Sequence, residues 1–582
     1  MSDVPSGDFA VERESWPEGL SRTLSFPHGR RPLHEYVREH ARDRPDAPAV
    51  TFYGRTLSWR EFDDAVDAFA AGLTRRGHGP GDVCALFLQN SPQFLVAYHG
   101  AHRAGLAVTP LNPQFETPAV RRQLDDSGAA VLVAHSGLLA TARPGLADTD
   151  VERVLLTAYG EYTGESSPVP VHPDVAEEPS VVDAFADGPG EGGGGPEETA
   201  FADLLAAGDD ADASPEEPSV TDRALLQYTG GTTGLPKGCV HTHWNVLFKA
   251  RTTAQVRRYD AADTLLGVMP LFHVAGKQRY CDALAATGCH TVLLARYGPE
   301  AVLAAVDEHD VTSTWLAVPA VEAMLDRPDL DRYDLRSLSA RRAFTNCSSF
   351  GTNLTREISD AWREVTGARL QESGYGLTET HTTDTHTYGD DRIEPGFVGQ
   401  PCYCVEVEIR DFESGATLPA GEQGEIVLRS PSTMEGYLDR PEATADVLEP
   451  DGFLHTGDVG RLTESGALYF LGRRKDTLKV SGHTVSPREV EVTLADHAAV
   501  DDVVVVGRPH ESRGTVLEAH VVPCGDAPDD DALEAALLDF AGETLAEYKR
   551  PVDVVRRESF PRTDVGKVDR AAYRDELPEE YR

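Results

Sequence analysis

A short glycine- and threonine-rich segment, residues 228–238 (YTGGTTGLPKG), most strongly constrains how this chain folds locally. Three glycines and three threonines lie within six residues, and Lys237 follows a proline. Glycine allows positive φ and close backbone approach, and successive N–H groups in such a turn form a concave anion site. The threonine hydroxyls add donors, and the Lys237 ammonium suits phosphate. The segment therefore predicts a loop that wraps a polyphosphate.

Two other interpretations of this segment bear on the prediction. A mobile Gly/Thr surface loop has about the same composition, so the six residues alone do not decide between the two. A P-loop is excluded, because GxxxxGK[ST] requires Lys directly after Gly and a hydroxyl after Lys. Here Pro236 precedes Lys237 and Gly238 follows it.

The chain length predicts more than one domain. At 582 residues, with 40% hydrophobic residues, a large body and a smaller unit are expected. The acidic N-terminus has no apolar signal-peptide core, and no apolar run approaches the ~18 residues needed to span a bilayer. The eight cysteines include no CxxC pair and are expected to be free thiols. A cytoplasmic protein is expected, and the sequence leaves a homodimer open.

The charge is extreme. Asp and Glu number 96 against 54 Lys and Arg, which gives a net charge of −42 spread along the chain. Such a surface argues against nucleic acid and anionic membranes as partners. Together with the scarcity of lysine, it is typical of the solvated surface of a halophilic protein.

Lysine is rare enough to be informative. The chain has seven lysines. Four lie in the motifs described below, Lys549 lies in the short block YKRP (residues 548–551), and Lys249 and Lys277 lie outside all of these. If the surface avoids lysine, the remaining ones are expected where chemistry or packing requires an ammonium group.

Alternating apolar strands and amphipathic helices predict the architecture. Helices are expected at residues 32–42, 59–77 and 92–104, with strands around residues 49–57, 84–90 and 106–110. Alternating β and α elements favour an α/β sheet domain. Residues 162–222 are rich in Gly, Pro, Asp and Glu, and predict a flexible acidic insertion that buries little apolar surface. After residue 475, short strands and helices predict a small α+β domain.

Two further motifs carry chemistry that fits a nucleotide. In ESGYGLTET (residues 372–380), Tyr375 between glycines can lie flat on a base, and Glu379 offers a carboxylate of the kind that Mg²⁺ prefers. In DGFLHTGD (residues 451–458), Asp458 at a turn can accept both ribose hydroxyls. A lone His273 after a strand (PLFHVAG) is usually structural, so its meaning depends on its neighbours.

Taken together, these blocks resemble the adenylate-forming superfamily, which includes acyl- and aryl-CoA synthetases, luciferases and peptide-synthetase adenylation domains. TGGTTGLPKG, PLFHVAG, YGLTE, TGD, GRRKDTLKVSG and PRTDVGKVDR follow in the family's order across residues 30–575. The family usually has Ser where this chain has Gly230. The resemblance implies an α/β fold with a large N-terminal domain of several subdomains and parallel or mixed sheets, followed by a small mobile α+β domain. The expected boundaries are residues 1–474 and 475–582.

The resemblance implies roles for the motif residues. ATP and AMP would be bound by a set of loop, adenine-side and ribose-side residues: Thr229, Gly230, Gly231, Thr232, Thr233, Gly234, Lys237, Ser349, Gly374, Tyr375, Gly376, Asp458 and Arg473. Mg²⁺ would be held by Thr229 and Glu379, and Thr378 would touch the α-phosphate.

The remaining roles concern the two half-reactions. Lys567 would enter the active site for adenylation, and His273 would position the acid. Lys475 would be the hinge between domains, and Gly482 would leave room for the pantetheine of coenzyme A.

The expected function is that of an ATP-dependent carboxylate–CoA ligase that makes an acyl-adenylate, with a fatty acid the expected class. The alternatives are loading of a carrier-protein thiol, or a non-catalytic acyl- or nucleotide-binding protein. Residues 276–280 (GKQRY) are polar where lipid-using relatives are apolar, which indicates either a polar or carboxylated acyl group or a solvent-facing segment. Residues 346–351 (NCSSFG) depart from the small turn that relatives carry near adenine.

Overall fold

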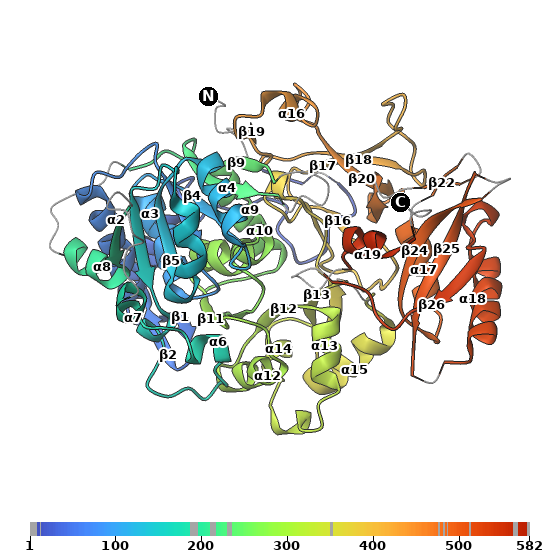
Figure 1. Cartoon of the computed structure of the whole chain (residues 1–582), viewed down its shortest axis with the longest axis horizontal. Coiled ribbons are helices and arrows are strands. Elements are labelled where there is room, and N and C mark those ends of the chain that lie inside the picture. Colours follow the sequence, from blue (N-terminus) through green and yellow to red (C-terminus); the bar gives the residue numbers. More distant parts are fainter. Residues whose placement is uncertain are drawn as a thin grey trace.

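A computed structural model describes residues 9–11, 13–186, 196–209, 217–229, 236–349, 353–474, 478–480, 483–485, 487–510, 514–525, 527–562 and 568–578. Two large mixed sheets, a four-stranded antiparallel sheet and a C-terminal sheet organise the chain, with helices packed on and between them (Figure 1). The expected α/β class is confirmed. No helix in the described ranges is long and apolar enough to cross a bilayer.

The first large sheet has eight strands and carries the glycine-rich loop. In spatial order they are β19 (Gly436–Tyr437), β9 (Gly238–Thr242), β8 (Arg223–Tyr228), β4 (Ala107–Pro110), β3 (Val83–Phe87), β5 (Ala129–His135), β6 (Arg153–Thr157) and β7 (Glu197–Ala200). Strands β8 and β9 are antiparallel, so the loop at residues 229–237 joins neighbouring strands. The strands from β4 to β7 pair in parallel.

The second large sheet has seven strands and carries the residues before the YGLTE motif. In spatial order they are β14 (Arg369–Glu372), β13 (Phe344–Ser348), β12 (Ser313–Ala317), β10 (Thr264–Gly267), β11 (His290–Leu293), β1 (Pro48–Phe52) and β2 (Arg55–Ser58). All neighbours pair in parallel except β1 and β2, which form a hairpin.

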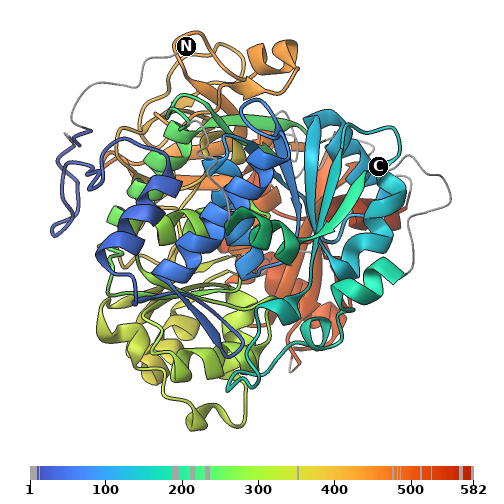
Figure 2. The ribbon, with the colours of Figure 1, turned by 90° about the vertical axis from the view of Figure 1, so that its left-hand side faces the viewer.

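Helices join the two large sheets into one body. Helix α3 (Pro92–Arg103) is buried at every position, as is nearly all of α9 (His243–Val256), so both lie inside the molecule rather than on one face. They share one hydrophobic core with α1 (Leu33–Asp43), α2 (Trp59–Arg75) and strands of both sheets. Figure 2 shows α1–α3 in blue beside the cyan strands.

The helix starts follow from local sequence. Ser58 accepts from Glu61 N and Glu61 returns a bond to the Ser58 N–H, which is a capping box for α2. Thr242 and Asn245 do the same for α9.

Shorter helices complete the N-terminal part. They are α4 (Thr117–Ser127), α5 (Leu139–Ala142), α6 (Pro173–Ala176), α7 (Val181–Ala186), α8 (Phe201–Asp209), α10 (Val274–Lys277), α11 (Ala283–Thr287), α12 (Pro299–Glu308), α13 (Val318–Leu325), α14 (Ser337–Ala340), α15 (Arg356–Thr366) and α16 (Pro441–Ala445). One turn of π-helix, Gln278–Asp282, lies between α10 and α11.

The expectation that residues 162–222 bury little apolar surface is wrong for the described part of that range. Strand β7 extends the eight-stranded sheet by pairing with β6, and α8 packs on α2. Phe201 and Leu204 of α8 are fully buried. The apolar patch around Phe201 therefore outweighs the acidic residues that flank it, because one helical face is enough to join the core.

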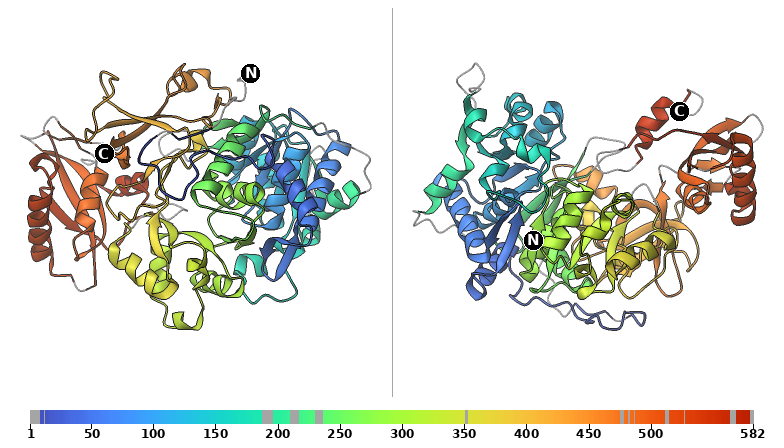
Figure 3. Two further views of the ribbon diagram at one scale, coloured as in Figure 1. Left: turned by 180° about the vertical axis from the view of Figure 1, so that it is seen from behind. Right: turned by 90° about the horizontal axis from the view of Figure 1, so that it is seen from below.

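Two smaller units follow. The antiparallel sheet is formed by β17 (Glu406–Arg410), β18 (Gly424–Arg429), β20 (Leu454–Leu462) and β21 (Leu468–Arg473), and a short ladder by β15 (Thr385–His386) and β16 (Gln400–Pro401). The C-terminal sheet contains β23 (His483–Val485), β22 (Leu478–Val480), β25 (Gly514–Pro523), β24 (Val500–His510) and β26 (Asp553–Arg556), with helices α17 (Pro487–Ala495), α18 (Asp530–Thr544) and α19 (Arg570–Glu576). This unit has its own apolar core and lies at the end of the molecule away from α2 and α8 (Figures 1 and 3).

Candidate active site

The glycines around Tyr375 are required by close backbone contacts. Gly374 has φ +116°, and a Cβ there would lie 2.5 Å from Thr385 O. A Cβ on Gly376 would lie 2.5 Å from Thr383 N. Any side chain at either position would therefore displace backbone, and the two glycines fix the turn that presents Tyr375.

Tyr375, Asp458 and Arg473 form one connected group. The Tyr375 hydroxyl donates to Asp458 Oδ2 at 2.6 Å, and Arg473 Nε lies 2.8 Å from Asp458 Oδ1. Asp458 and Arg473 are in-register partners on β20 and β21. Burial raises the pKa of Asp458 to about 6, against the opposing effect of Arg473. The structure thus brings the predicted adenine-side and ribose-side residues together.

Lys237, Tyr437 and Glu379 form a second group. The Lys237 ammonium lies 4.2 Å from the centre of the Tyr437 ring, and the Tyr437 hydroxyl donates to Glu379 Oε1 at 2.8 Å. Strand β19 carries Tyr437 and pairs with β9, which begins directly after Lys237. Glu379 also acts electrostatically on Asp458, so the two groups are neighbours.

The ends of the glycine-rich loop close on each other. Thr229 N donates to Lys237 O at 3.0 Å, and Lys237 N donates to the Thr229 hydroxyl at 3.3 Å. The hairpin therefore holds Thr229 beside Lys237. Eight predicted site residues lie outside the described residues: Gly230, Gly231, Thr232, Thr233, Gly234, Lys475, Gly482 and Lys567.

Thr378 and Ser349 are each held by a hydrogen bond to a neighbouring side chain. The Thr378 carbonyl accepts from buried His241 at 2.9 Å, and burial keeps the pKa of His241 well below its usual value. Ser349 donates to Glu372 Oε2 at 2.8 Å, which ties the end of β13 to the end of β14. His273 caps α10 by accepting from Ala275 N at 3.3 Å, and its side chain is exposed.

Sequence reasoning missed two features of this region. Tyr437 was not among the predicted site residues, yet its hydroxyl donates to Glu379. A fully buried ionic cluster also lies behind the site: Lys277 Nζ is 2.8 Å from Asp282 Oδ2, and His381 Nε2 is 3.0 Å from the same oxygen. The scarcity of lysine was the available signal for Lys277, but it named no partner.

The solvent-facing interpretation of residues 276–280 is wrong. Lys277, Gln278, Arg279 and Tyr280 are all at most 3% exposed. The polar loop at residues 381–391 is likewise partly internal: His381 joins Asp282, and Asp384 lies 2.6 Å from Lys249 Nζ. Within the described ranges, no three His, Cys, Asp or Glu side chains are grouped as a metal site.

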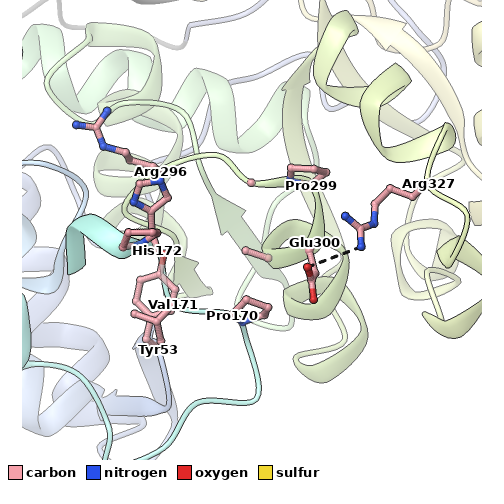
Figure 4. A pocket seen from close by; sticks show the side chains of 11 residues that line it. Tyr53, Pro170, Val171, His172, Arg296, Pro299, Glu300 and Arg327 are labelled. Atoms are coloured by element: carbon pink, nitrogen blue, oxygen red, sulfur yellow. Dashed lines mark ion pairs between the residues drawn. The ribbon is translucent and has the colours of Figure 1, made fainter. Parts of the chain in front are cut away.

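An open pocket of about 280 Å³ lies on another part of the surface (Figure 4). It is lined by Tyr53, residues 170–173 and residues around α12, and Arg327 lies 3.7 Å from Glu300 beside it. None of its lining residues belongs to the predicted site. Residues 170–173, inside the range that was expected to be a flexible insertion, form one wall of this pocket.

Comparisons with known proteins identify the family. Residues 37–438 match the model of the AMP-binding enzyme family, and residues 489–567 match that of the AMP-binding enzyme C-terminal domain. The chain belongs to the AMP-binding enzyme family. The predicted resemblance to adenylate-forming enzymes is thereby confirmed.

The similarity to individual AMP-binding enzymes extends over nearly the whole chain. It is 31% identical to a long-chain-fatty-acid–CoA ligase of Bacillus subtilis, over 97% of this chain and 98% of that protein. A protein of the same name from Salmonella typhimurium is 31% identical over 92% and 93%. The crystal structure of ATP-bound MatB from Rhodopseudomonas palustris has a TM-score of 0.78 at 24% identity, covering 95% of this chain and all of that one, which shows a shared fold.

Proposed function

We propose that this chain is an ATP-dependent, AMP-forming carboxylate–CoA ligase acting on an aliphatic, fatty-acid-like acid. The observation that carries the proposal is the joining of two residue groups, Tyr375–Asp458–Arg473 and Lys237–Tyr437–Glu379, in a chain of the AMP-binding enzyme family. Relatives named long-chain-fatty-acid–CoA ligases match along almost the full chain. All eight cysteines, each in a described range, are free, which agrees with a cytoplasmic enzyme.

The first group is suited to a nucleoside. Tyr375 stacks on adenine, and the Asp458 carboxylate accepts from the ribose hydroxyls while Arg473 keeps it ionised and oriented. A buried carboxylate held by two donors is pre-organised, so little order is lost when the nucleoside binds.

The second group is suited to the phosphates. Lys237 supplies positive charge at the mouth of the Gly/Thr loop, and Glu379 and Thr229 supply the hard oxygen atoms that fit Mg²⁺. Mg²⁺, when bound, would neutralise phosphate charge. Tyr437 orients Glu379 through its hydroxyl and lies beneath Lys237 with its ring, so one side chain positions both groups.

The chemistry has two steps. A carboxylate oxygen attacks the α-phosphorus of ATP, the bond to the β-phosphate breaks, and pyrophosphate leaves the acyl-adenylate. The sulfur of coenzyme A, having lost its proton, then forms a bond with the acyl carbon, and AMP leaves. We assign Lys567 to stabilise charge at the α-phosphate in the first step, where a compact ammonium is effective, with Thr378 contacting that phosphate and His273 positioning the acid.

The two steps need different arrangements of residues 1–474 and 475–582. We propose that Lys475 is the hinge and that Gly482 borders the coenzyme A path after rotation. Arg488 of α17 donates to Asn353 at 2.9 Å, which is one contact that the rotation has to break.

The deciding experiment measures pyrophosphate release from ATP and Mg²⁺ in molar KCl over a panel of carboxylic acids, with and without coenzyme A. We expect one acid class to drive release and coenzyme A to convert it to acyl-CoA and AMP. Release that ignores coenzyme A would favour a carrier-protein thiol as acceptor. A folded protein that binds ATP but responds to no acid would favour the binding-protein alternative.

Lys567→Ala tests the assignment of the two half-reactions. We expect loss of adenylation, with thioesterification of supplied acyl-adenylate retained, because Lys567 acts in the first step only. Arg556→Ala, at an exposed arginine of the same C-terminal unit, serves as the control. Intact adenylation in Lys567→Ala would show that the role is assigned to the wrong residue.

A further inference from the structure

The helical segment after His273 carries a buried guanidinium. Arg279 lies in the π-helical turn Gln278–Asp282 and is 3% exposed. Single π turns in helices frequently occur at functional sites, because they redirect side chains that a regular helix would place elsewhere. Arg279 lies six positions after His273 on the same helical segment.

The guanidinium of Arg279 has contacts at one end, and one of its nitrogen atoms has no hydrogen-bond partner among the described residues. Its Nη2 donates to Ser373 Oγ at 3.0 Å, and the guanidinium lies 4.8 Å from the centre of the Trp315 ring. No described residue accepts a hydrogen bond from Nη1, and no carboxylate in the described ranges forms an ion pair with Arg279. Ser373 is two residues before Tyr375, so the guanidinium lies between the helix of His273 and the adenine-side turn.

A second buried donor lies on the strand that pairs with the strand of Trp315. Asn346 on β13 is 3% exposed and is the in-register partner of Trp315 on β12. In-register residues on parallel neighbours point to the same face of a sheet, so Asn346 lies beside the ring that Arg279 covers. Its Nδ2 has no acceptor among the described residues. Two donors without acceptors are therefore gathered at one place.

The surroundings do not neutralise Arg279. Arg257, also buried, donates to the same Ser373 and adds a second positive charge, and burial followed by repulsion from Arg279 lowers the pKa of Arg257 to about 9. The nearby Glu372 is hydrogen-bonded to Ser349 instead, and burial raises its pKa. Burying an unpaired charge is strongly unfavourable, so its presence indicates a partner that the described residues do not supply.

We propose that Arg279, with Asn346, binds a second carboxylate at the far end of the acid, so that the preferred substrates are dicarboxylic acids activated at one end. This rests on the proposed function and names its substrate class. The near carboxylate is adenylated beside His273 and the far one stays ionised, with its oxygens accepting from Arg279 and Asn346. A plain alkyl end would leave both donors unsatisfied, and such a mismatch discriminates strongly between substrates.

The test compares straight-chain monocarboxylic acids with α,ω-dicarboxylic acids of the same carbon number, over a range of about four to sixteen carbons. Acyl-CoA formation gives kcat/KM for each pair. We expect the wild-type protein to prefer the diacid at least tenfold at its best length. In Arg279→Met the ratio of diacid to monoacid should fall to near one, mainly through a higher KM for the diacid.

Two further variants separate charge from packing. Arg279→Lys keeps the positive charge and should restore part of the preference. Arg258→Met removes an exposed arginine outside the site and should keep the wild-type ratio. The wild-type comparison needs no variant, so the proposal stays testable even if Arg279→Met does not fold.

The outcomes distinguish the two proposals. If monoacids are converted to acyl-CoA as well as or better than matched diacids, the inference about Arg279 is wrong while the ligase function stands. If Arg279→Met is folded and keeps the diacid preference, the inference is also wrong. If no acid in either series releases pyrophosphate, both the inference and the proposed function are wrong.

Discussion

At the scale of single residues, Tyr437 has the largest unexpected role. Its ring contacts Lys237 and its hydroxyl reaches Glu379, so one side chain joins the lysine that we propose binds phosphate to the carboxylate that we propose binds Mg²⁺. The sequence around Tyr437 does not predict this contact, because the contact depends on β19 pairing with β9.

Replacing Tyr437 by Phe tests this role. The ring remains under Lys237, and Glu379 loses a hydrogen bond of the kind worth roughly 1.5–3 kcal/mol for charged acceptors. We expect kcat/KM for ATP to fall about tenfold or more on that basis, with little change in the unfolding midpoint. Tyr403→Phe, which removes a hydroxyl bonded to Ser21 O elsewhere, is the matched control. Unchanged ATP kinetics in Tyr437→Phe would contradict the positioning role.

Asp458 predicts a pH dependence of nucleoside binding. Because burial raises its pKa to about 6, the carboxylate is ionised at pH 7.5 and becomes protonated as the pH falls through that value. An ionised acceptor binds ribose hydroxyls more strongly, so adenosine affinity should fall about tenfold between pH 7.5 and 5. Adenosine is used since it has no phosphate that titrates in this range.

Asp458→Asn is the control for this titration. The variant should bind adenosine weakly and with little pH dependence between pH 7.5 and 5. The variant keeps nearby His455, whose pKa is raised by Glu449 and Glu425. Any pH dependence of adenosine affinity that remains in the variant is therefore assigned to His455. Equal wild-type affinity at both ends of the range would exclude Asp458 as the ribose acceptor.

At the scale of elements, two buried lysines form ion pairs inside the molecule. Lys249 of α9 and Lys277 of α10 are fully buried and paired with Asp384 and Asp282. They were the two lysines outside the sequence motifs, and the expectation that each serves packing or chemistry is confirmed for both. The turn containing His381, Thr382 and Thr383 has positive φ at all three residues, and Lys249 Nζ donates to the Thr383 carbonyl at 3.0 Å.

Helix α8 predicts a stability effect inside the expected insertion. Leu204 is fully buried against α2, so Leu204→Ala should lower the free energy of unfolding by about 2–5 kcal/mol. Its neighbour Leu205 is only partly buried, and Leu205→Ala should cost clearly less. Urea denaturation of both variants measures the difference. Equal, small effects would mean that α8 does not belong to the core.

At the scale of the whole molecule, acidic side chains lie near one another at the boundary between the C-terminal unit and the rest of the chain. Burial and then nearby Asp501 raise the pKa of Glu322, and burial and then Glu357 raise that of Asp496. With a net charge of −42, repulsion at this boundary adds to a general self-repulsion of the fold. We propose that the acidic surface is adapted to high salt.

This proposal predicts stabilisation by KCl. The screening length falls from about 10 Å at 0.1 M to about 3 Å at 1 M, so the urea midpoint should rise over that range. The double variant Glu322→Gln and Glu357→Gln should be more stable at low salt and should gain less from KCl. Glu413→Gln, on an exposed loop, is the control. A midpoint that falls with KCl would contradict the proposal.

The sequence by itself determined the family and the order of elements, because these depend on local spacing. For the nucleotide site it supplied a prediction of the residues. Helices α1–α3 and strands β1–β4 lie within a few residues of the ranges that the sequence predicted. Gly374 and Gly376 were indicated by their place beside Tyr375 in the motif, and the structure supplies the reason, since backbone contacts exclude a side chain at both.

Only the tertiary structure decided the partners. It placed Tyr437 beneath Lys237, folded β7 and α8 of the acidic insertion into the main body, and enclosed residues 277–280. These facts depend on strand pairing and helix packing between segments far apart in the chain, and no local pattern encodes them. The same holds for Arg279. The sequence shows an arginine among polar neighbours, but only the packing of β12, β13 and the π turn shows that it is buried without a described carboxylate partner.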